Sequence, residues 1–502
     1  MKKTRVLSGI LALLMLVAPL ASCATENEPD DTKPSDQTTA VTEGETQLKD
    51  NLPDGLNYNG QEITVISRSR LGWFHDEMQV DNLTGEPVND AIYERNKMVE
   101  ERLGVKLINI TDNDVEAYTI PLKVDTAVKA GTSEYDFMAA AAHATANTSL
   151  SGTFANLNST QYLDLEQIWW TQGYNEALEY NDMQFSATGA IALTTYRLAF
   201  TTVFNKGLFD EANQPYLYDV VDAGKWTLDK QASLVPLFHR DNGNGTPDEQ
   251  GDIFGFITND FISVDPYWSA CSMDFLGRDE EGDYQLIFNT GKVHDVTEKI
   301  MYLFYGTNGA TYNIKHQDGD GEQEVMRRMF SEGLGAMATL RIMELESSVM
   351  RNTDQQYGVI PMPKFDEKQD SYHTLLHDQF TVIAIPTTVK DQRLHMVSAV
   401  LEAMASASYN TVRPAYYETT LRTKIAQDPQ SAAMMDVITE NIYIDAGLLY
   451  IKIFENFHSS FRGMIQGGVN DATSRFTAIN KKSKSATANL NKKLDRLLSQ
   501  QE

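Results

Sequence analysis

The chain has 502 residues, of which 42% are hydrophobic and 10% aromatic, so it can bury a core large enough for two or more lobes. Its formal net charge of −28 excludes nucleic acid as a partner and disfavours anionic headgroups, because like charges repel. Only two cysteines occur, Cys23 and Cys271, so stability must come from core burial and not from a disulfide framework.

The N-terminus has the features of a secretory signal. Basic residues at positions 2, 3 and 5 precede an apolar run, Val6 to Leu20, that is shorter than the roughly 20 residues of a membrane span. The run leads into Leu20-Ala21-Ser22-Cys23, which resembles the bacterial lipobox. The resemblance implies that residues 1–22 are a lipoprotein signal peptide and that Cys23 carries palmitate-type acyl chains, which hold a soluble protein at the outer face of the cell membrane. The alternative is an ordinary signal peptide cut near Ala21.

The next stretch, residues 23–59, is rich in Thr, Glu, Asp, Pro and Gln and has no aromatic residue before Tyr58. Such a segment cannot bury enough apolar surface to fold, and its like charges keep it extended. We therefore expect a lipid-anchored, acidic, disordered linker that ends where the first strand begins.

The first folded segments alternate between strand and helix patterns. Apolar and polar residues alternate in 62–67 and 105–110, and a short apolar run at 136–139 reads as a third strand. Helical periodicity covers 89–103 and 120–130, between these strands. This order predicts parallel α/β units.

The later part of the chain continues the mixture of strands and helices. Strands are predicted at 198–206 and 380–385, and a helix is predicted to start after Trp226, with Thr227 as its N-cap and Trp226 in the core. The other predicted helices cover 174–179, 293–305, 323–332, 392–407, 431–440 and 486–498.

Standard catalytic signatures are absent from the sequence, which has no Walker loop, His-Glu-x-x-His, Cys-x-x-Cys or Gly-x-Ser-x-Gly. The run from Gly333 to Ala338 fits a dinucleotide fingerprint but follows a predicted helix, whereas phosphate binding needs a strand-to-helix turn. With 70 Asp and Glu residues, paired carboxylates occur by chance, so they neither establish nor exclude a glycosidase. We expect no enzyme and no required cofactor.

One polar loop partly matches an EF-hand calcium loop, with Gly245 at the sharp-turn position. The candidate ligands are Asn242, Asn244, Thr246, Asp248 and Asp252. Arg240 occupies the first position and Gly251 the twelfth, so both end carboxylates of a tight site are lost. The pattern predicts a weak structural calcium site, and a polar loop ordered by Asx turns is the alternative.

Aromatic and polar residues gather where predicted strands meet loops. Because the carboxyl ends of parallel strands line a crevice, we interpret these residues as its walls. Flat aromatic rings suit the apolar face of a sugar, and polar side chains suit its hydroxyls. The candidate ligand-binding residues are Trp73, His143, Asn147, Tyr196, Asp265, Tyr267, Trp268, Arg341, His458 and Arg462. Cys271 lies in an aromatic, apolar stretch and is predicted to be a buried, inert thiol.

From about Glu62 to at least Ile479, the chain resembles the extracellular solute-binding proteins of bacterial ABC importers, family 1, of the maltose-binding type. Besides the lipobox, the resemblance depends on the order of several runs. These runs are Thr194–Asp210 with its Phe-Asn-Lys, Phe330–Gly333 before Ala336-Met337, Tyr357–Lys364, and Arg413–Tyr417.

The resemblance implies an α/β, two-lobed, periplasmic-binding-protein-like fold, in which each lobe is a mainly parallel sheet flanked by helices and the ligand cleft lies between the lobes. Lobe 1 would be 60–190 with 340–386, and lobe 2 would be 191–339 with 387–502. The resemblance also implies that Asp265 and Tyr267 contact a sugar. His143 lies near a loop where that family has an acid, which makes an identical sugar doubtful.

The implied function is capture of a sugar or oligosaccharide outside the membrane by hinge closure, followed by delivery to an ABC permease. The expected partners are a small carbohydrate and the permease subunits, with membrane contact through the N-terminal lipid alone and a monomeric chain. Two alternatives remain, a lipid-anchored secreted glycoside hydrolase and a non-enzymatic surface adhesion lipoprotein.

Overall fold

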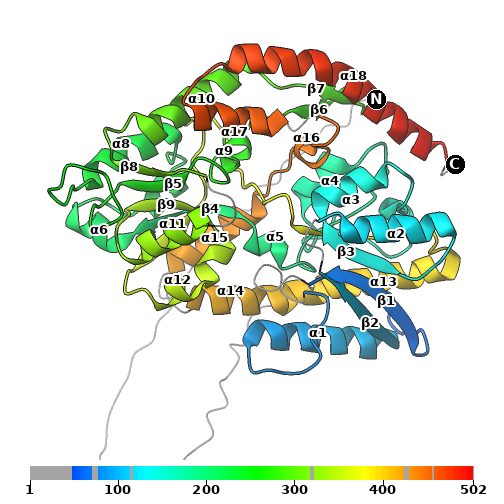
Figure 1. The fold of residues 1–502 in the computed structure, drawn as a ribbon. Coiled ribbons are helices and arrows are strands. Elements are labelled where there is room, and N and C mark those ends of the chain that lie inside the picture. The colour runs from blue at the N-terminus through cyan, green and yellow to red at the C-terminus, as the bar shows by residue number, and fades with distance from the viewer. Residues whose placement is uncertain are drawn as a thin grey trace, which may run out of the picture. The chain divides into compact units, whose positions relative to one another are not determined.

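The structure is a computed structural model that describes residues 48–69, 77–113, 117–316, 321–422, 429–454 and 457–500. The predicted signal peptide, the predicted acylation site Cys23 and the predicted site residue Trp73 lie outside these residues. All the described residues belong to one unit of the chain, residues 47–502, which contains two main sheets and the helices around them (Figure 1).

The first sheet forms mainly from the N-terminal α/β units. Its strands are, in spatial order, β11 (Thr381–Ala384), β3 (Phe137–Ala141), β1 (Gln61–Arg68) and β2 (Val105–Asp112). β1 pairs in parallel with β2 and with β3, and α1 (Pro87–Leu103) and α2 (Thr119–Ala130) make the connections. This confirms the predicted parallel α/β order, to which β11 adds an antiparallel edge.

Helix α1 shows how the local sequence sets helix ends. The Glu86 carboxylate accepts a hydrogen bond from the backbone N–H of Asn89 at 2.8 Å, and Pro87 occupies the first turn, where no intrahelical donor is needed. The helix ends at Gly104, whose φ of 58° is left-handed and costs glycine little. The buried side chains of Ile92, Val99 and Leu103 then attach the helix to the core.

The second sheet has five strands. In spatial order they are β10 (Tyr357–Ile360), β4 (Phe200–Asn205), β9 (Met337–Arg341), β5 (Phe256–Asn259) and β8 (Thr311–Ile314). β5 is parallel to β8 and β9, β4 is antiparallel to β9, and β10 is antiparallel to β4. Every residue of β4, β5, β9 and β10 is buried, so these strands lack the alternation by which half-exposed strands are found in a sequence.

Three helices close to the second sheet match the sequence predictions, namely α8 (Leu228–Phe238), α10 (Thr290–Tyr305) and α11 (Gly321–Ser331). The Thr227 hydroxyl accepts from the backbone N–H of Lys230 at 3.2 Å, which confirms the predicted cap. Trp226 is completely buried and its indole N–H donates to the carbonyl of Pro361 at 2.9 Å, which confirms its place in the core.

The remaining elements connect and cover the sheets. They are α3 (Ala142–Ser149), η1 (Leu157–Ser159), α4 (Gln172–Leu178), α5 (Thr194–Arg197), α6 (Lys206–Glu211), α7 (Tyr218–Asp222), α9 (Pro266–Ala270), the hairpin β6 (Leu276–Arg278) and β7 (Tyr284–Leu286), η2 (Ile342–Glu346), α12 (Ser348–Asn352), α13 (Asp391–Asn410), α14 (Val412–Arg422), α15 (Pro429–Glu440), α16 (Ala446–Leu449), α17 (Phe457–Gly467) and α18 (Ala472–Leu498). Within the described residues, no helix combines the length and the apolar character that a membrane crossing requires.

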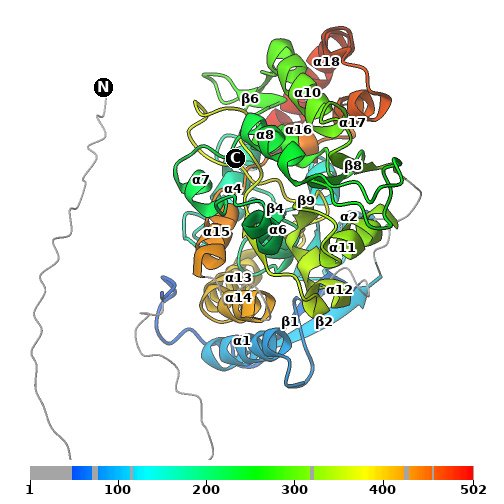
Figure 2. The same cartoon turned by 90° about the vertical axis from the view of Figure 1, so that its left-hand side faces the viewer.

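The division of the chain between the sheets differs from the expected lobe boundaries in two places. β10 was expected with the first lobe, in 340–386, but it pairs with β4 in the second sheet. Helices α13 and α14 were expected in the second lobe, in 387–502, but both lie against α1 of the first (Figures 1 and 2). Strand pairing and helix packing are long-range, so sequence order alone does not determine which sheet a segment joins.

Within the described residues, three passages of the chain contact one another between the two sheets. The segment leading into β4 and the segment leading into β11 lie antiparallel, since Ala199 bridges Leu376 and Ala187 bridges Ile383. The third passage follows α15 and meets the second one through a parallel bridge from Ile442 to Thr374. The passages bring residues from distant parts of the sequence together between the sheets.

The end of the expected linker is ordered, contrary to the sequence prediction for 23–59. Asp50 pairs with Arg102 of α1 at 2.6 Å, and the backbone N–H of Leu48 donates to the side chain of Asn410. Leu52 is buried. The side chains of Leu52 and Leu56 therefore let this part of the segment pack, whereas 23–47 lies outside the described residues.

Candidate functional site

A cavity of about 270 Å³ lies where the three passages meet the edges of the sheets. Its lining residues are Phe200, Phe261, Ile262, Asp265, Trp268, Leu375, Leu376, His377, Asp378, Gln379, Phe380, Ile444, Asp445, Leu448, Leu449, Ile451, His458, Phe461 and Arg462. Most are apolar or aromatic, and the few polar side chains come from separate segments, which is typical of a small-molecule site.

The strand directions explain why the cavity forms here. In the first sheet, Ala141 ends β3 and pairs with Thr381, where β11 begins. In the second sheet, Arg341 ends β9 and pairs with Phe200, where β4 begins, and Asn259 ends the parallel strand β5 at the same edge. The carboxyl edges of the parallel strands in both sheets are therefore next to the segments that line the cavity, as expected for open α/β sheets.

One wall carries an ion pair between two elements of the second-sheet side. Arg462 on α17 donates from Nε to Asp265 Oδ1 at 3.1 Å and from Nη2 to Asp265 Oδ2, and both side chains are largely buried. The Arg462 guanidinium also lies 3.9 Å from the centre of the Phe261 ring. The pair fills this wall without adding net charge to the cavity.

A carboxylate surrounded by histidines lies on the segment that leads into β11. Asp378 is 47% exposed, and its backbone carbonyl accepts from Nδ1 of His143 at 2.9 Å, which sets the His143 tautomer. Burial lowers the pKa of His377 to about 4 and also lowers the pKa of His458. Burial alone would raise the pKa of Asp378, but the surrounding His377 and His143 lower it, so the group is an anionic acceptor.

Two polar atoms of the lining are buried without a hydrogen-bond partner among the described residues. They are Nδ1 of His458 and Oε1 of Gln379. Leaving a buried polar atom without a hydrogen-bond partner destabilises the protein by about 1 to 3 kcal/mol. A ligand hydroxyl that forms this hydrogen bond removes the penalty and so contributes directly to binding. The same lining contains the aromatic rings of Phe261, Phe380 and Phe461.

The third passage contributes a buried carboxylate, Asp445. It accepts from the indole N–H of Trp268 at 3.1 Å and from the backbone N–H groups of Phe275 and Gly447 at 2.7 and 2.8 Å. Burial, together with the nearby Asp274, raises the pKa of Asp445 to about 7. Asp445 thereby orients the ring of Trp268 at the cavity and ties the third passage to the second-sheet side.

The structure brings four of the predicted site residues together in the lining, namely Asp265, Trp268, His458 and Arg462. His143 contacts the lining through Asp378, and the amide of Asn147 donates to the carbonyl of Leu449, a lining residue. Tyr196, Tyr267 and Arg341 lie elsewhere in the described structure, and Trp73 lies outside the described residues.

Tyr267, Arg341 and Tyr196 differ from the prediction. Tyr267 is completely buried edge-on to Phe304, and Arg341 is buried in an ion pair with Glu344, so the core holds both side chains away from the cavity surface. Tyr196 stacks on Tyr416 and lines another hollow, on the α13 and α14 side. Neighbouring sequence positions project in different directions, which the pattern of aromatic residues could not distinguish.

Sequence reasoning missed His377, Asp378, Gln379 and Asp445. The first three directly precede the predicted strand 380–385. They would have been found if the residues just before an antiparallel edge strand had also been taken as candidates for the site. Asp445 lies in a loop-like stretch without any pattern, and only the third passage places it at the cavity.

The predicted calcium loop is ordered by its own side chains, of which Asn242 and Asn244 are exposed and Asp252 is buried. Asp252 accepts from the backbone N–H groups of Asn242 and Asp248 at 2.8 and 3.1 Å, and the side chain of Asn244 accepts from the N–H of Thr246 at 2.7 Å. The amide of Asn244 also donates to Asp248 at 2.6 Å. The oxygens proposed as ligands thus form Asx-type turns here, and weak calcium binding stays a prediction.

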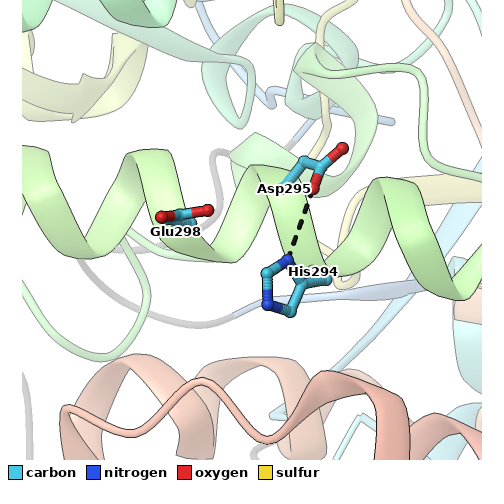
Figure 3. Close-up of side chains that lie close together, drawn as sticks. All are labelled: His294, Asp295 and Glu298. Carbon is cyan, nitrogen blue, oxygen red and sulfur yellow. Dashed lines mark hydrogen bonds and ion pairs between the residues drawn. The ribbon is translucent and has the colours of Figure 1, made fainter.

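A separate group of potential metal ligands lies on α10, where His294, Asp295 and Glu298 face solvent on neighbouring turns (Figure 3). Nδ1 of His294 lies 3.3 Å from a carboxylate oxygen of Asp295, and both side chains are substantially exposed. Exposed acidic groups of this kind are common on helices, and nothing buried orients them, so we assign no site here.

Two further predictions are settled by the fold. Cys271 is completely buried, which confirms the predicted burial, and burial raises the pKa of its thiol to about 12, which disfavours the reactive thiolate. The run from Gly333 to Ala338 connects the end of α11 to β9, so it is a helix-to-strand turn without the amide arrangement that phosphate binding requires.

No protein-family model matches the sequence, and no curated protein matches it. Solved structures do match. The cyclic α-maltosyl-1,6-maltose binding protein from Arthrobacter globiformis is 14% identical with a TM-score of 0.57, over 86% of this chain and 100% of that one. A sugar transporter from Rhizobium etli in an open conformation is 12% identical with a TM-score of 0.52, over 84% and 99%.

UgpB from Mycobacterium tuberculosis, in complex with glycerophosphocholine, is 14% identical with a TM-score of 0.51, over 88% of this chain and 100% of that one. At such low identity the likeness shows the fold. The chain has the mixed α/β, two-lobed, periplasmic-binding-protein-like fold that the sequence resemblance implied.

Proposed function

We propose that the protein is the substrate-binding component of an ABC importer, which captures a sugar outside the membrane and delivers it to a permease. One observation carries the proposal. The passages between the two sheets enclose a cavity with aromatic walls, one anionic acceptor and two unpartnered polar atoms, at the carboxyl edges of the strands. A polyhydroxylated ring supplies both the apolar face and the hydroxyls that this lining needs.

The comparisons support the proposal by analogy of fold. Among the structures that match, UgpB is in complex with glycerophosphocholine, MalE3 from T. maritima is bound to maltose, and the Arthrobacter globiformis protein binds cyclic α-maltosyl-1,6-maltose. In the lining, Asp265 is held by Arg462, which is better suited to a fixed wall than to proton transfer. We therefore propose binding without catalysis, by a monomer that an acylated Cys23 tethers to the outer face of the cell membrane.

The size of the cavity favours a small solute. At about 270 Å³ it is at the lower end of ligand sites, which typically have volumes of roughly 300 to 1,000 Å³. A solute of one or two sugar rings fits this volume better than a long oligosaccharide. Closure of the lobes around it would complete the site by hinge motion at the three passages.

A thermal-shift screen against a carbohydrate library tests the proposal. A sugar at 100 times its dissociation constant should add about 2.7 kcal/mol to the free energy of unfolding, and the scattering radius should fall as the lobes close. His458→Ala should lose the shift because it removes a lining nitrogen, whereas His294→Ala, on the exposed face of α10, should keep it. If no sugar stabilises the protein, or if His458→Ala binds normally, this cavity is not the sugar site.

A further inference from the structure

The C-terminal helix α18 carries a charge opposite to that of the rest of the protein. It contains seven Lys and Arg residues and a single acid, Asp495, in a chain whose formal net charge is −28. One face of the helix is buried through Phe476, Leu490, Leu494 and Leu497. The cations do not take part in this packing, so another cause is needed for their concentration here.

Five exposed cations on the other side of α18 form what we call the basic stripe. They are Lys481, Lys484, Lys492, Lys493 and Arg496. Within the described residues, none of the five side chains has an ion-pair or hydrogen-bond partner. Other exposed lysines, such as Lys123 and Lys129, pair with a carboxylate, so the basic stripe is a row of five positive charges that no neighbouring carboxylate of the described chain compensates.

The position of the helix leaves the basic stripe accessible. Both views show α18 at the periphery, with no other element over its outer side (Figures 1 and 2). With 27 residues, the helix is about 40 Å long, so its cations are spread along a line and not gathered in a pocket. A small anion would meet only one or two of them, whereas an extended anionic surface can meet all five.

We infer that α18 is a docking surface for the anionic headgroups of a lipid bilayer. The inference depends on the proposed position of the protein beside the outer face of a membrane, where a flat array of phosphates is the nearest extended anionic surface. The exposed side of α18 has no row of large apolar side chains, so the contact would be electrostatic adsorption without insertion.

The overall charge does not oppose this contact. The screening length at physiological salt is about 8 Å, so only charges close to the bilayer are felt. Two elements that pack against α18 carry exposed acids, Asp295 and Glu298 on α10 and Glu280 and Glu281 in the β6–β7 turn, whereas Asp283 of that turn accepts a hydrogen bond from the Tyr180 hydroxyl. From the sequence, the net charge was expected to disfavour anionic headgroups, on the assumption that charge is spread evenly over the surface. The cations gathered on α18 show that it is not spread evenly.

Vesicle sedimentation tests the inference. The processed chain, beginning at residue 23 with Cys23→Ser to prevent acylation, is mixed with phosphatidylcholine vesicles that contain or lack 30% phosphatidylglycerol. We expect binding to the anionic vesicles alone, with release at about 0.5 M salt. Replacing all five stripe residues by Gln should lower the partition coefficient at least about tenfold.

The matched control replaces five exposed lysines elsewhere, Lys97, Lys106, Lys225, Lys368 and Lys390, by Gln, and should bind as the parent does. Circular dichroism and retained sugar binding show that each variant is folded. No binding to anionic vesicles, or equal loss in both variants, overturns the inference. Self-association in light scattering that only the stripe variant loses would identify a second copy as the occupant and also overturn it. Sugar binding is measured separately, so failure here leaves the proposed function untouched.

Discussion

Arg462 on α17 holds Asp265, at the start of α9, through two roughly parallel hydrogen bonds, and thereby joins the C-terminal helices to the wall of the cavity. The two residues are almost 200 positions apart in the sequence. The pair is partly buried, with side-chain exposures of 13% and 19%, so solvent screens it only in part. Removing this ion pair therefore tests how much it contributes to stability and to the shape of the cavity wall.

Arg462→Ala should lower the free energy of unfolding by about 1 to 3 kcal/mol, because it leaves the Asp265 carboxylate partly buried without its partner. It should also weaken sugar binding, since Phe261 loses the guanidinium that packs on its ring. Urea denaturation and calorimetry measure the two effects. Arg475→Ala, which breaks an exposed pair on α18, is the control and should change neither by more than about 0.5 kcal/mol.

Tyr267→Ala should act on stability, although the sequence analysis placed this ring against the sugar. The side chain is completely buried, and removing it leaves a cavity that costs about 3 to 5 kcal/mol. Urea denaturation measures this cost. Tyr267→Phe keeps the ring and should bind sugar with unchanged affinity, so a large loss of affinity in Tyr267→Phe would contradict this placement.

His377 should make the protein less stable in mild acid. Burial lowers its pKa to about 4, from 6.5 in the unfolded chain, so between these values the unfolded state binds more protons. The contribution of neutral His377 to the free energy of unfolding is therefore fully present above about pH 6.5. It falls by about 2 to 3 kcal/mol as the pH drops to 4. Comparing His377→Gln with the parent by denaturation at several pH values isolates this term, and the exposed His294→Gln should show no such difference.

Glu402 should change the free energy of unfolding with pH in the direction opposite to that of His377. Its carboxylate accepts the indole N–H groups of Trp169 and Trp170, both at 3.0 Å, and burial raises its pKa to about 7. Between about pH 4.5 and 7 the folded state binds more protons, so the stability contributed by Glu402 falls as the pH rises, by up to about 3 kcal/mol.

Glu402→Gln does not titrate, and its amide can accept from only one of the two indoles at its single oxygen. The variant should therefore be less stable than the parent at pH 5, by a margin that shrinks towards pH 8. Urea denaturation across this range measures the margin, with the exposed Glu94→Gln as control. A margin that is constant with pH would show that Glu402 does not titrate in this window.

The polar loop from Asn242 to Asp252 should bind calcium only at millimolar concentration. The metal would have to displace backbone N–H groups from Asp252, and Arg240 and Gly251 supply no carboxylate at the ends of the loop. Isothermal titration calorimetry measures the affinity, and Asp248→Asn should abolish the heat. Absence of heat at millimolar calcium would leave the Asx turns as the whole role of this loop.

The sequence by itself determined those parts of the protein that depend on local patterns. Apolar alternation in 62–67 and 105–110 located β1 and β2, Thr227 marked the start of α8, and the apolar surroundings of Cys271 predicted its burial. Each of these signals involves residues within a few positions of one another, where backbone geometry and side-chain periodicity act directly.

Only the tertiary structure decided which segments share a sheet and which side chains reach the cavity. β10 joins β4 through long-range pairing, and Asp378, Gln379 and Asp445 line the cavity because three chain passages converge there. The neighbouring residues Tyr267 and Trp268 are both buried, but only Trp268 borders the cavity. The physical reason is that pairing and burial bring together residues far apart in the chain, and no local pattern records that contact.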